Sequence, residues 1–231
     1  MSAVSDTAWI ANLLQLSDTF YPTGSYAHSF GLEGLVQDGF VRDRASLREF
    51  LLEQALPSLA STDLVVAAAA WKAAGDPSDF ERLTELCQLG SALRGAREPR
   101  EASEAIGRQR LELLAQRPDA SPLVRRLREQ GGSTPSSVIA AIEARALGAP
   151  VEAALSALIY SAAAGLLAAA VKLLRLGQNA VQSLLTEALA LAPSLIARAL
   201  ATPLAEAGAF TPWWDVAAAR HERADFRLFI S

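Results

Sequence analysis

A run of 19 residues without a charged side chain, from Ala153 to Val171, constrains the fold more than any other feature of the sequence. Its length approaches the roughly 20 residues that span a bilayer. Strongly apolar aliphatic residues are few in it, however, and Ala, Ser and Gly make up most of the rest. Leu155, Ile159 and Leu166 fall on one helical stripe, and small residues such as Gly165 permit close approach of another helix. The run is therefore predicted to be the central helix of a bundle and not a membrane span.

The first part of the chain is predicted to form two helices joined by a tight turn. Trp9, Leu13 and Leu16 repeat at helical spacing and predict a first helix that ends at Ser17. A Tyr-Pro-Thr-Gly turn then breaks the pattern. The second helix is expected to be capped by a hydroxyl residue of that turn, to carry His28, and to end near the following Asp-Gly pair.

The rest of the chain shows helix signals only. Ser46 and Glu49 have the form of a capping box and predict a third helix that starts at Ser46. No strand-like alternation of useful length and no repeat of 20 to 50 residues is present. The prediction is an all-α bundle of roughly eight to eleven helices. Because 231 residues fit one core and the flexible stretch 131–137 is short for a linker, residues 1–231 are predicted to form one domain.

Charge and cysteine content exclude several classes of protein. The formal net charge is −4 with a pI near 5.3, and the arginines are interspersed with glutamates, which argues against a nucleic-acid binder. Cys87 is the one cysteine, so no internal disulfide can form. The start of the chain lacks the basic and apolar regions of an export signal, and a cytoplasmic location is expected.

Residues for catalysis or stable metal binding are scarce. The two histidines, His28 and His221, and Cys87 lie far apart and form no compact ligand spacing. No strand precedes the glycines near His28, so they are not a nucleotide-binding fingerprint. Ser25 or Ser29 could pair with His28, but no nucleophile elbow accompanies them. The sequence favours a protein without a catalytic site, and a transient metal site of a histidine with a carboxylate stays open.

Apolar and aromatic residues gather in a C-terminal tail, at about 210–231, although the body of the chain is poor in aromatics. Such a dense apolar end is either tucked against its own bundle or kept for a partner, and the sequence leaves both alternatives open. Aromatics and arginines are the types that dominate interface energetics. The apolar members are Phe210, Trp213, Trp214, Phe226, Leu228, Phe229 and Ile230, and the basic ones are Arg220, Arg223 and Arg227.

Three parts of the sequence resemble the UreF family of urease accessory proteins. Residues 13–18 (LLQLSD) and 21–33 (YPTGSYAHSFGLE) resemble the opening signature of that family. Residues 169–178 (AAVKLLRLGQ) look like its Val-Lys…Leu-Gly-Gln segment. Residues 220–222 (RHE) with 227–231 (RLFIS) look like its C-terminal end. The matches follow in the right order and cover essentially the full length.

This resemblance implies a helical homodimer without catalysis of its own. Family members bind the accessory protein UreD, also called UreH, recruit the GTPase UreG, and help to load nickel into the active site of the urease apoprotein. The complex is then expected to deliver nickel, with no cofactor stably bound to this chain. Neither nucleic acid nor a membrane is an expected partner.

The matching stretches supply the candidate partner-binding residues. His28, Ser29 and Glu33 are expected to lie together on the second helix as a polar surface patch. Lys172 and Gln178 flank the end of the central helix, where a cation also complements the helix dipole. The tail is expected to become ordered on binding. Its candidates are Arg220, His221, Glu222, Arg227, Leu228, Phe229 and Ser231.

Two other interpretations use the same features. A helical adaptor for an unrelated client fits the composition equally well if the motif match is fortuitous. A small hydrolase or metal enzyme centred on His28 is the third, and it rests on the serines beside that imidazole.

Overall fold

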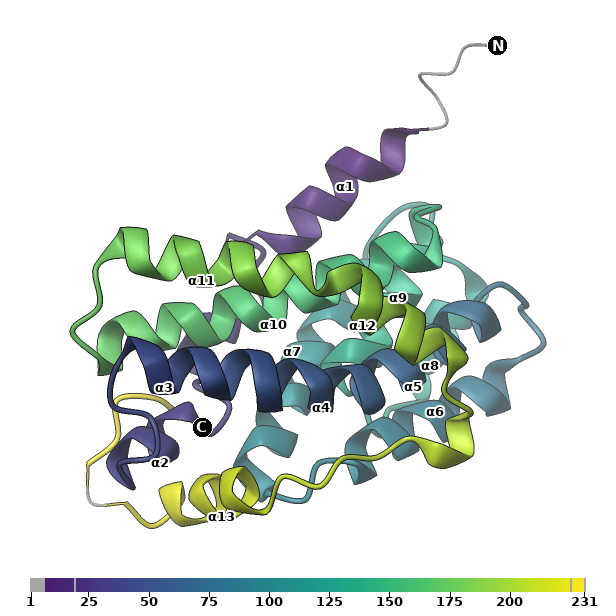
Figure 1. Cartoon of the computed structure of the whole chain (residues 1–231). Coiled ribbons are helices and arrows are strands. Elements are labelled where there is room, and N and C mark those ends of the chain that lie inside the picture. The colour runs from purple at the N-terminus through teal and green to yellow at the C-terminus, as the bar shows by residue number, and fades with distance from the viewer. Residues whose placement is uncertain (1–6, 19, 225, 231) are drawn as a thin grey trace.

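The computed structural model describes residues 7–18, 20–224 and 226–230, and all regular elements within these ranges are helices (Figure 1). Most of them are joined by short turns, and longer connections precede α2 and α13. The α-helices are α1 (Ala8–Ser17), α2 (Leu32–Gln37), α3 (Arg44–Glu49), α4 (Leu56–Ser61), α5 (Asp63–Ala73), α6 (Phe80–Ala92), α7 (Arg97–Ala115), α8 (Pro122–Gln130), α9 (Ser136–Ala146), α10 (Val151–Leu173), α11 (Gln178–Ala190), α12 (Ala192–Ala201) and α13 (Pro212–His221). Short 3-10 turns are η2 (Ser25–Ala27) and η4 (Leu204–Glu206).

Several of these segments are continuous with one another. A π-helical stretch, η3 (Phe50–Ala55), joins α3 to α4, and only Thr62 separates α4 from α5. In the same way only Leu191 separates α11 from α12. Counted as continuous rods, the described residues form ten helices. The predicted all-α fold of roughly eight to eleven helices is confirmed.

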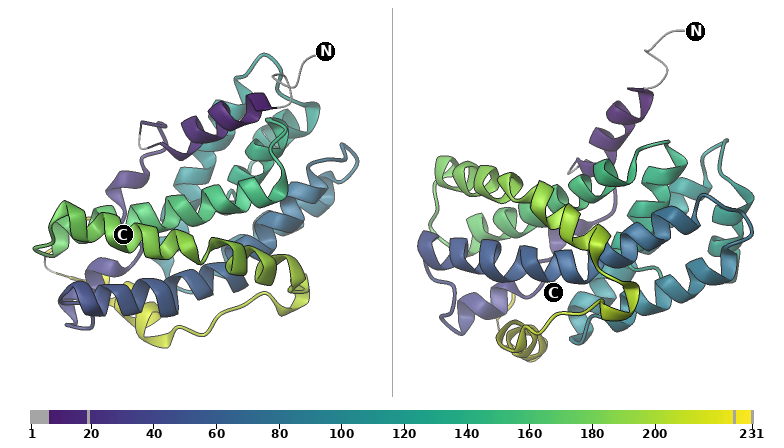
Figure 2. Two further views of the ribbon diagram at one scale, coloured as in Figure 1. Left: turned by 45° about the horizontal axis from the view of Figure 1, so that its top comes forward. Right: turned by 45° about the vertical axis from the view of Figure 1, so that its right-hand side comes forward.

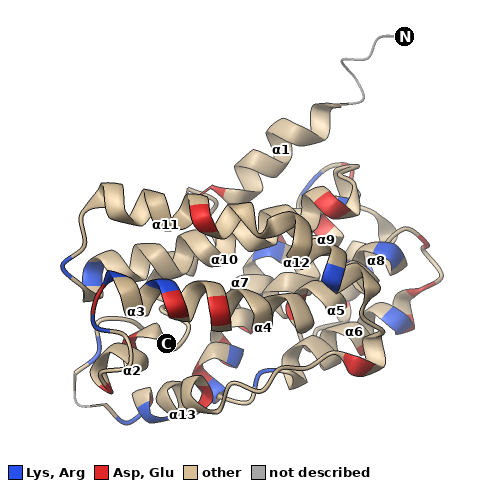
Figure 3. Cartoon of the chain, viewed as in Figure 1, with Lys and Arg blue, Asp and Glu red and all other residues tan. Residues whose placement is uncertain are grey.

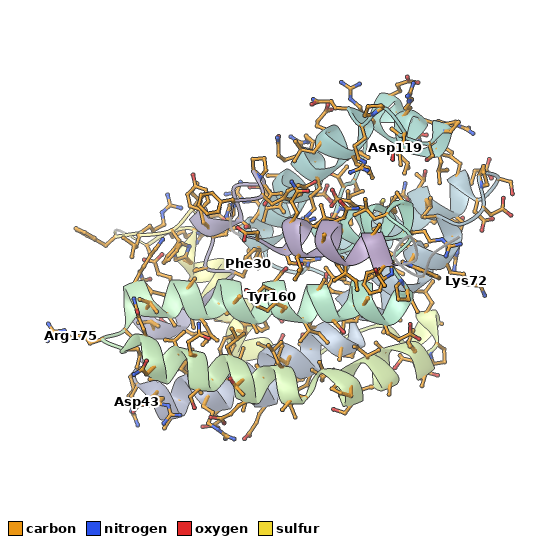
Figure 4. The ribbon with its side chains drawn as sticks, turned by 90° about the horizontal axis from the view of Figure 1, so that it is seen from above. Phe30, Asp43, Lys72, Asp119, Tyr160 and Arg175 are labelled. Carbon is orange, nitrogen blue, oxygen red and sulfur yellow. The ribbon has the colours of Figure 1, made fainter. Side chains whose placement is uncertain are left out.

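Helix α10 occupies the centre of the bundle, as the uncharged run predicts. Its inward stripe, which includes Leu155 and Ile159, is fully buried and belongs to one apolar cluster that extends along the chain from Leu32 to Phe229. Helices α9 and α11 pack against α10, and α1 lies along another flank of it (Figures 2 and 4). The expectation that Gly165 allows a close helix approach is wrong, because a Cβ added there would meet nothing within 4 Å.

Two helical stretches among the described residues are long and apolar enough to cross a membrane. They are α10 and the run Gln178–Ala201 that comprises α11 and α12. Length and composition alone are weak evidence, because the core helix of a globular bundle passes the same test. The burial of the apolar stripe of α10 inside the bundle accounts for its composition without a bilayer.

The third helix begins at Arg44, two residues before the predicted start. Asp43 is the N-cap: its carboxylate accepts a hydrogen bond from the Ser46 backbone N–H at 2.8 Å, and the Ser46 hydroxyl accepts one from the Asp43 N–H at 3.1 Å. A capping box is therefore present, but Ser46 is its third helical residue and not its cap. The prediction was wrong in register because Asp and Ser are both good caps and stand three residues apart.

Candidate functional site

The entry to α2 is a sharp left-handed turn. After the 3-10 turn η2 the chain is extended at His28, and Phe30 and Gly31 then adopt φ angles of 53° and 87°. The predicted continuous second helix that carries His28 and Ser29 is therefore wrong. Helix α2 starts only at Leu32, and His28 and Ser29 precede it. The turn points Ser29 inward, where its hydroxyl accepts a 3.3 Å hydrogen bond from the Glu33 N–H.

Helix α13 fixes this turn from a distant part of the sequence. The Trp214 indole N–H donates to the Phe30 carbonyl at 2.8 Å, and the Phe50 ring packs edge-on against Trp214 with 5.0 Å between centroids. A Cβ at Gly31 would lie 2.7 Å from the indole nitrogen. Glycine is therefore required at this position by both its positive φ and its close contact with α13.

His221, the last residue of α13, is buried between two carboxylates. Its Nε2 lies 2.9 Å from Glu33 Oε2, and its Nδ1 lies 2.7 Å from Glu98 Oε2. The Arg227 guanidinium donates to Glu98 Oε1 at 2.9 Å. The His221 side chain is 1% exposed. We call these four residues, Glu33, Glu98, His221 and Arg227, the clasp. Glu33 and Glu98 stand in the first turns of α2 and α7, where the helix dipole favours a negative charge.

The clasp holds the C-terminal end of the chain against α2. Glu33 accepts backbone hydrogen bonds from the N–H groups of Leu228 at 2.7 Å and Phe229 at 3.0 Å. The Ile230 N–H donates to the carbonyl of Ala27 at 3.0 Å. We call residues 226–230 the strap. Figure 1 shows that the C-terminal end of the chain lies beside α2, although the two are far apart in the sequence.

Side chains of the strap alternate between the body and solvent, as expected for an extended segment. Arg227 joins the clasp, and the Phe229 ring is buried with the Lys172 ammonium 5.0 Å from its centroid. Phe226, Leu228 and Ile230 point outward, and Phe226 is 89% exposed. The strap is therefore ordered against the bundle without a partner, which differs from the expectation that the tail becomes ordered on binding. A partner-binding role for its outward side chains stays a prediction.

A second apolar patch lies on the outer side of α13. Phe40 and Trp213 stack with ring centroids 5.7 Å apart while both remain exposed, and Phe210 in the preceding extended segment is almost fully exposed. Exposed aromatics in this number on neighbouring segments are typical of an interaction surface.

A second buried charged cluster ties the N-terminal turn to the bundle. The Tyr21 hydroxyl donates to Glu143 of α9, and Arg110 of α7 donates to Glu143 at 2.7 Å and to the Leu16 carbonyl at 3.0 Å. Burial raises the pKa of Glu143 above its ordinary value although Arg110 lies beside it. Burial and the Glu143 carboxylate also raise the pKa of the Tyr21 phenol. The cluster has a structural role, because each member is satisfied by the others.

The remaining reactive groups are poorly placed for chemistry. Burial raises the pKa of the Cys87 thiol to about 12, so the nucleophilic thiolate is not available near neutral pH. Both ring nitrogens of His221 already face carboxylates. In the part of the chain that the structure describes, no group of three His, Cys, Asp or Glu side chains is arranged to hold a metal ion.

Comparison with known proteins identifies the family. The family model described as UreF matches residues 41–189. The chain belongs to the UreF family. A "Urease accessory protein UreF" of Methylibium petroleiphilum is 35% identical over 237 residues, covering 100% of this chain and 97% of its own. The protein of the same name from Pseudomonas fluorescens is 35% identical over 227 residues, with 97% and 99% covered. That of Granulibacter bethesdensis is 32% identical over 230 residues, with 100% and 97% covered.

The structure brings most of the residues matched to the UreF motifs into one region. Ser29, Glu33, His221 and Phe229 are buried there and bonded within the chain. Ser29 and Glu33 therefore do not form the surface patch expected with His28. His28 is half-buried, and burial lowers the pKa of its imidazole. A partner-binding role for these five residues stays a prediction.

The other candidates surround the clasp or lie farther away. Arg220 and Glu222 make ion pairs with Asp38 and Arg97, which tie the end of α13 to α2 and α7. Lys172 is exposed in the last turn of α10, where it complements the helix dipole. Gln178 is the exposed first residue of α11. Ser231 lies outside the described residues.

Glu98 is the member of the clasp that sequence reasoning missed. It lies in a segment rich in Arg and Glu that reads as a solvated helix, and its imidazole partner is 123 residues away. Its position in the first turn of a helix was the available signal, but that signal indicates a dipole contact and identifies no partner.

Proposed function

We propose that this UreF-family chain is a docking protein of urease assembly. It binds UreD/UreH, recruits the GTPase UreG, and helps the complex to insert nickel into the urease apoprotein in the cytoplasm. It performs no catalysis of its own and holds no cofactor stably. The chain acts as one domain and as a homodimer.

The observation that carries this proposal is the outward row of the strap. Phe226, Leu228 and Ile230 are large, apolar and exposed, yet their backbone is fixed by Glu33 and by the Ala27 carbonyl. A surface that is ordered before binding loses less conformational entropy when a partner arrives. The patch on α13 is a second exposed apolar area with aromatics, the residue type that contributes most to interface energetics.

Two further observations support the proposal. The buried titratable groups of the clasp hold segments of the chain together, and the thiol of Cys87 is buried and protonated, which suits a binding protein. Helices α10, α11 and α12 carry few charges (Figure 3), and apolar side chains such as Tyr160, Leu189 and Leu200 are exposed on them. Figure 4 shows Tyr160 on the upper side of α10. A weakly charged helical face of this kind suits self-association.

Removal of the outward row tests the proposal. In the variant Phe226→Ala, Leu228→Ala, Ile230→Ala we expect recovery of UreD in copurification to fall by about tenfold or more, because central apolar contacts each contribute about 1 kcal/mol or more. UreG recovery with GTP should fall with it. The melting temperature of the variant alone should change by no more than about 2 °C, since exposed side chains contribute little to folding.

The matched control makes the same three changes elsewhere, as Phe20→Ala, Leu14→Ala and Ile10→Ala. These side chains are also exposed but lie outside the strap and the α13 patch. The control should copurify both partners as the unmodified protein does. Unchanged recovery of UreD and UreG by the strap variant would show that the strap is not the docking surface.

A further inference from the structure

The charges of the clasp balance only in one protonation state of His221. Glu33 and Glu98 contribute two negative charges, and Arg227 contributes one positive charge. An imidazolium at His221 brings the sum to zero. A neutral imidazole leaves one negative charge of the clasp uncompensated. His221, Glu33 and Glu98 are almost entirely buried and only Arg227 reaches solvent, so this charge is costly in a site of low dielectric constant.

Hydrogen bonding leads to the same conclusion independently of charge. A carboxylate can only accept hydrogen bonds, and each ring nitrogen of His221 faces a carboxylate oxygen. The imidazolium has two N–H groups and satisfies both contacts. Neutral imidazole has one N–H, so whichever tautomer forms, one ring nitrogen turns its lone pair toward a carboxylate.

The strap depends on the same carboxylates. Glu33 accepts from His221 and from the backbone N–H groups of Leu228 and Phe229, and Glu98 accepts from His221 and Arg227. When one hydrogen bond of His221 is lost, the carboxylates of Glu33 and Glu98 repel each other across the ring. Both carboxylates are bonded to residues of the strap. Loss of the proton is thereby transmitted to the segment that carries the outward apolar row.

We propose that the clasp is a proton-dependent lock, in which the imidazolium of His221 holds the strap against α2 and loss of its proton releases the strap. Closure on the acidic side and release on the alkaline side are expected. This device goes beyond the proposed docking function, because it concerns the isolated chain and requires no partner.

Other groups packed around the clasp do not produce this dependence. The Glu222–Arg97 pair joins the end of α13 to α7, and the hydrogen bond from Arg97 lowers the pKa of Glu222. The Asp38–Arg220 pair joins the end of α2 to α13 through an exposed guanidinium. Lys172 of α10 faces the Phe229 ring, with its ammonium 5.0 Å from the ring centroid. Burial lowers the pKa of the His28 imidazole, so it loses its proton at more acidic pH.

Hydrogen exchange of the full chain between about pH 5 and about pH 9 tests the lock, since this interval contains the range of about pH 5 to 8 in which an ordinary imidazole changes its charge. After correction for the intrinsic pH dependence of exchange, protection of the Leu228 and Phe229 amides should fall on the order of tenfold as pH rises, because a hydrogen bond to a charged group is lost. Core amides of α5 should keep their protection. Flat protection of the strap across the range would overturn the proposal.

Two variants separate the lock from other causes. In Glu98→Gln the amide nitrogen can donate to a neutral His221 while the amide oxygen accepts from Arg227, so the neutral ring is fully satisfied and the charges balance. Strap protection in this variant should no longer fall with pH, and retention of the wild-type fall would contradict the lock. His28→Gln leaves His221 as the only imidazole and should keep the fall. Its loss would assign the effect to His28 and equally overturn the proposal.

Discussion

Replacing Gly107 by alanine is expected to lower the free energy of unfolding by about 3 kcal/mol, a fall of roughly 10 °C in melting temperature. Gly107 stands where α7 passes the loop that leads into α9, and an added Cβ would lie 1.8 Å from the Thr134 carbonyl oxygen. The loop cannot easily move away, because the Thr134 hydroxyl donates to the Glu104 carbonyl at 3.0 Å and its N–H donates to the Glu104 carboxylate. Either α7 separates from α9 or these hydrogen bonds break.

Gly165→Ala is the control for the same substitution in a helix. A Cβ added at Gly165 in α10 would meet nothing within 4 Å. Alanine there should stabilise the protein by about 0.5 to 1 kcal/mol, because it reduces the entropy of the unfolded chain. Thermal unfolding followed by circular dichroism measures both variants. A melting temperature of Gly107→Ala within about 2 °C of the unmodified protein would contradict the close approach of α7 to the loop.

The sequence predicts those parts of the fold that depend on local pattern. The uncharged run at the centre of the chain is sufficient to identify α10, because a helix with so little charge has to be buried by its neighbours. The entry to α2 could not be predicted in this way. His28, Leu32 and Leu35 stand at helical spacing, but the backbone of Phe30 is fixed by the indole of Trp214, 184 residues along the chain. Local propensity does not contain such a contact.

The sequence predicts two members of the clasp but not their contact. His221 and Glu33 lie in stretches that match the UreF motifs, so the resemblance marked them as important. The sequence could not show that they meet, because their separation is 188 residues and each also fits a surface role. Pairs of this kind depend on how α2, α7 and α13 pack, and that packing is decided by the whole core.

Replacing Arg110 by methionine is expected to destabilise the protein by about 3 kcal/mol at neutral pH. The change removes the positive partner of Glu143, whose side chain is 2% exposed. Within the described residues the Tyr21 hydroxyl then remains as its hydrogen-bond donor. Methionine preserves much of the aliphatic volume, so the loss reflects the unpaired buried charge. Arg128→Met is the control, because the Arg128–Glu112 pair is exposed and should contribute less than about 1 kcal/mol.

The destabilisation of Arg110→Met should depend on pH in a defined direction. Burial already raises the pKa of Glu143, so the folded protein holds this proton more tightly than the unfolded chain does, and stability falls as pH rises through the folded pKa. Without the guanidinium the pKa of Glu143 rises further, because the nearby charge that lowers it most has gone. Urea unfolding at about pH 7 and about pH 5 should therefore show that Arg110→Met loses less free energy of unfolding at the lower pH, where Glu143 can take up a proton. The loss in the Arg128→Met control should not change in this way. A deficit that stays flat or grows on acidification would show that loss of Arg110 does not raise the pKa of Glu143, and would contradict this prediction.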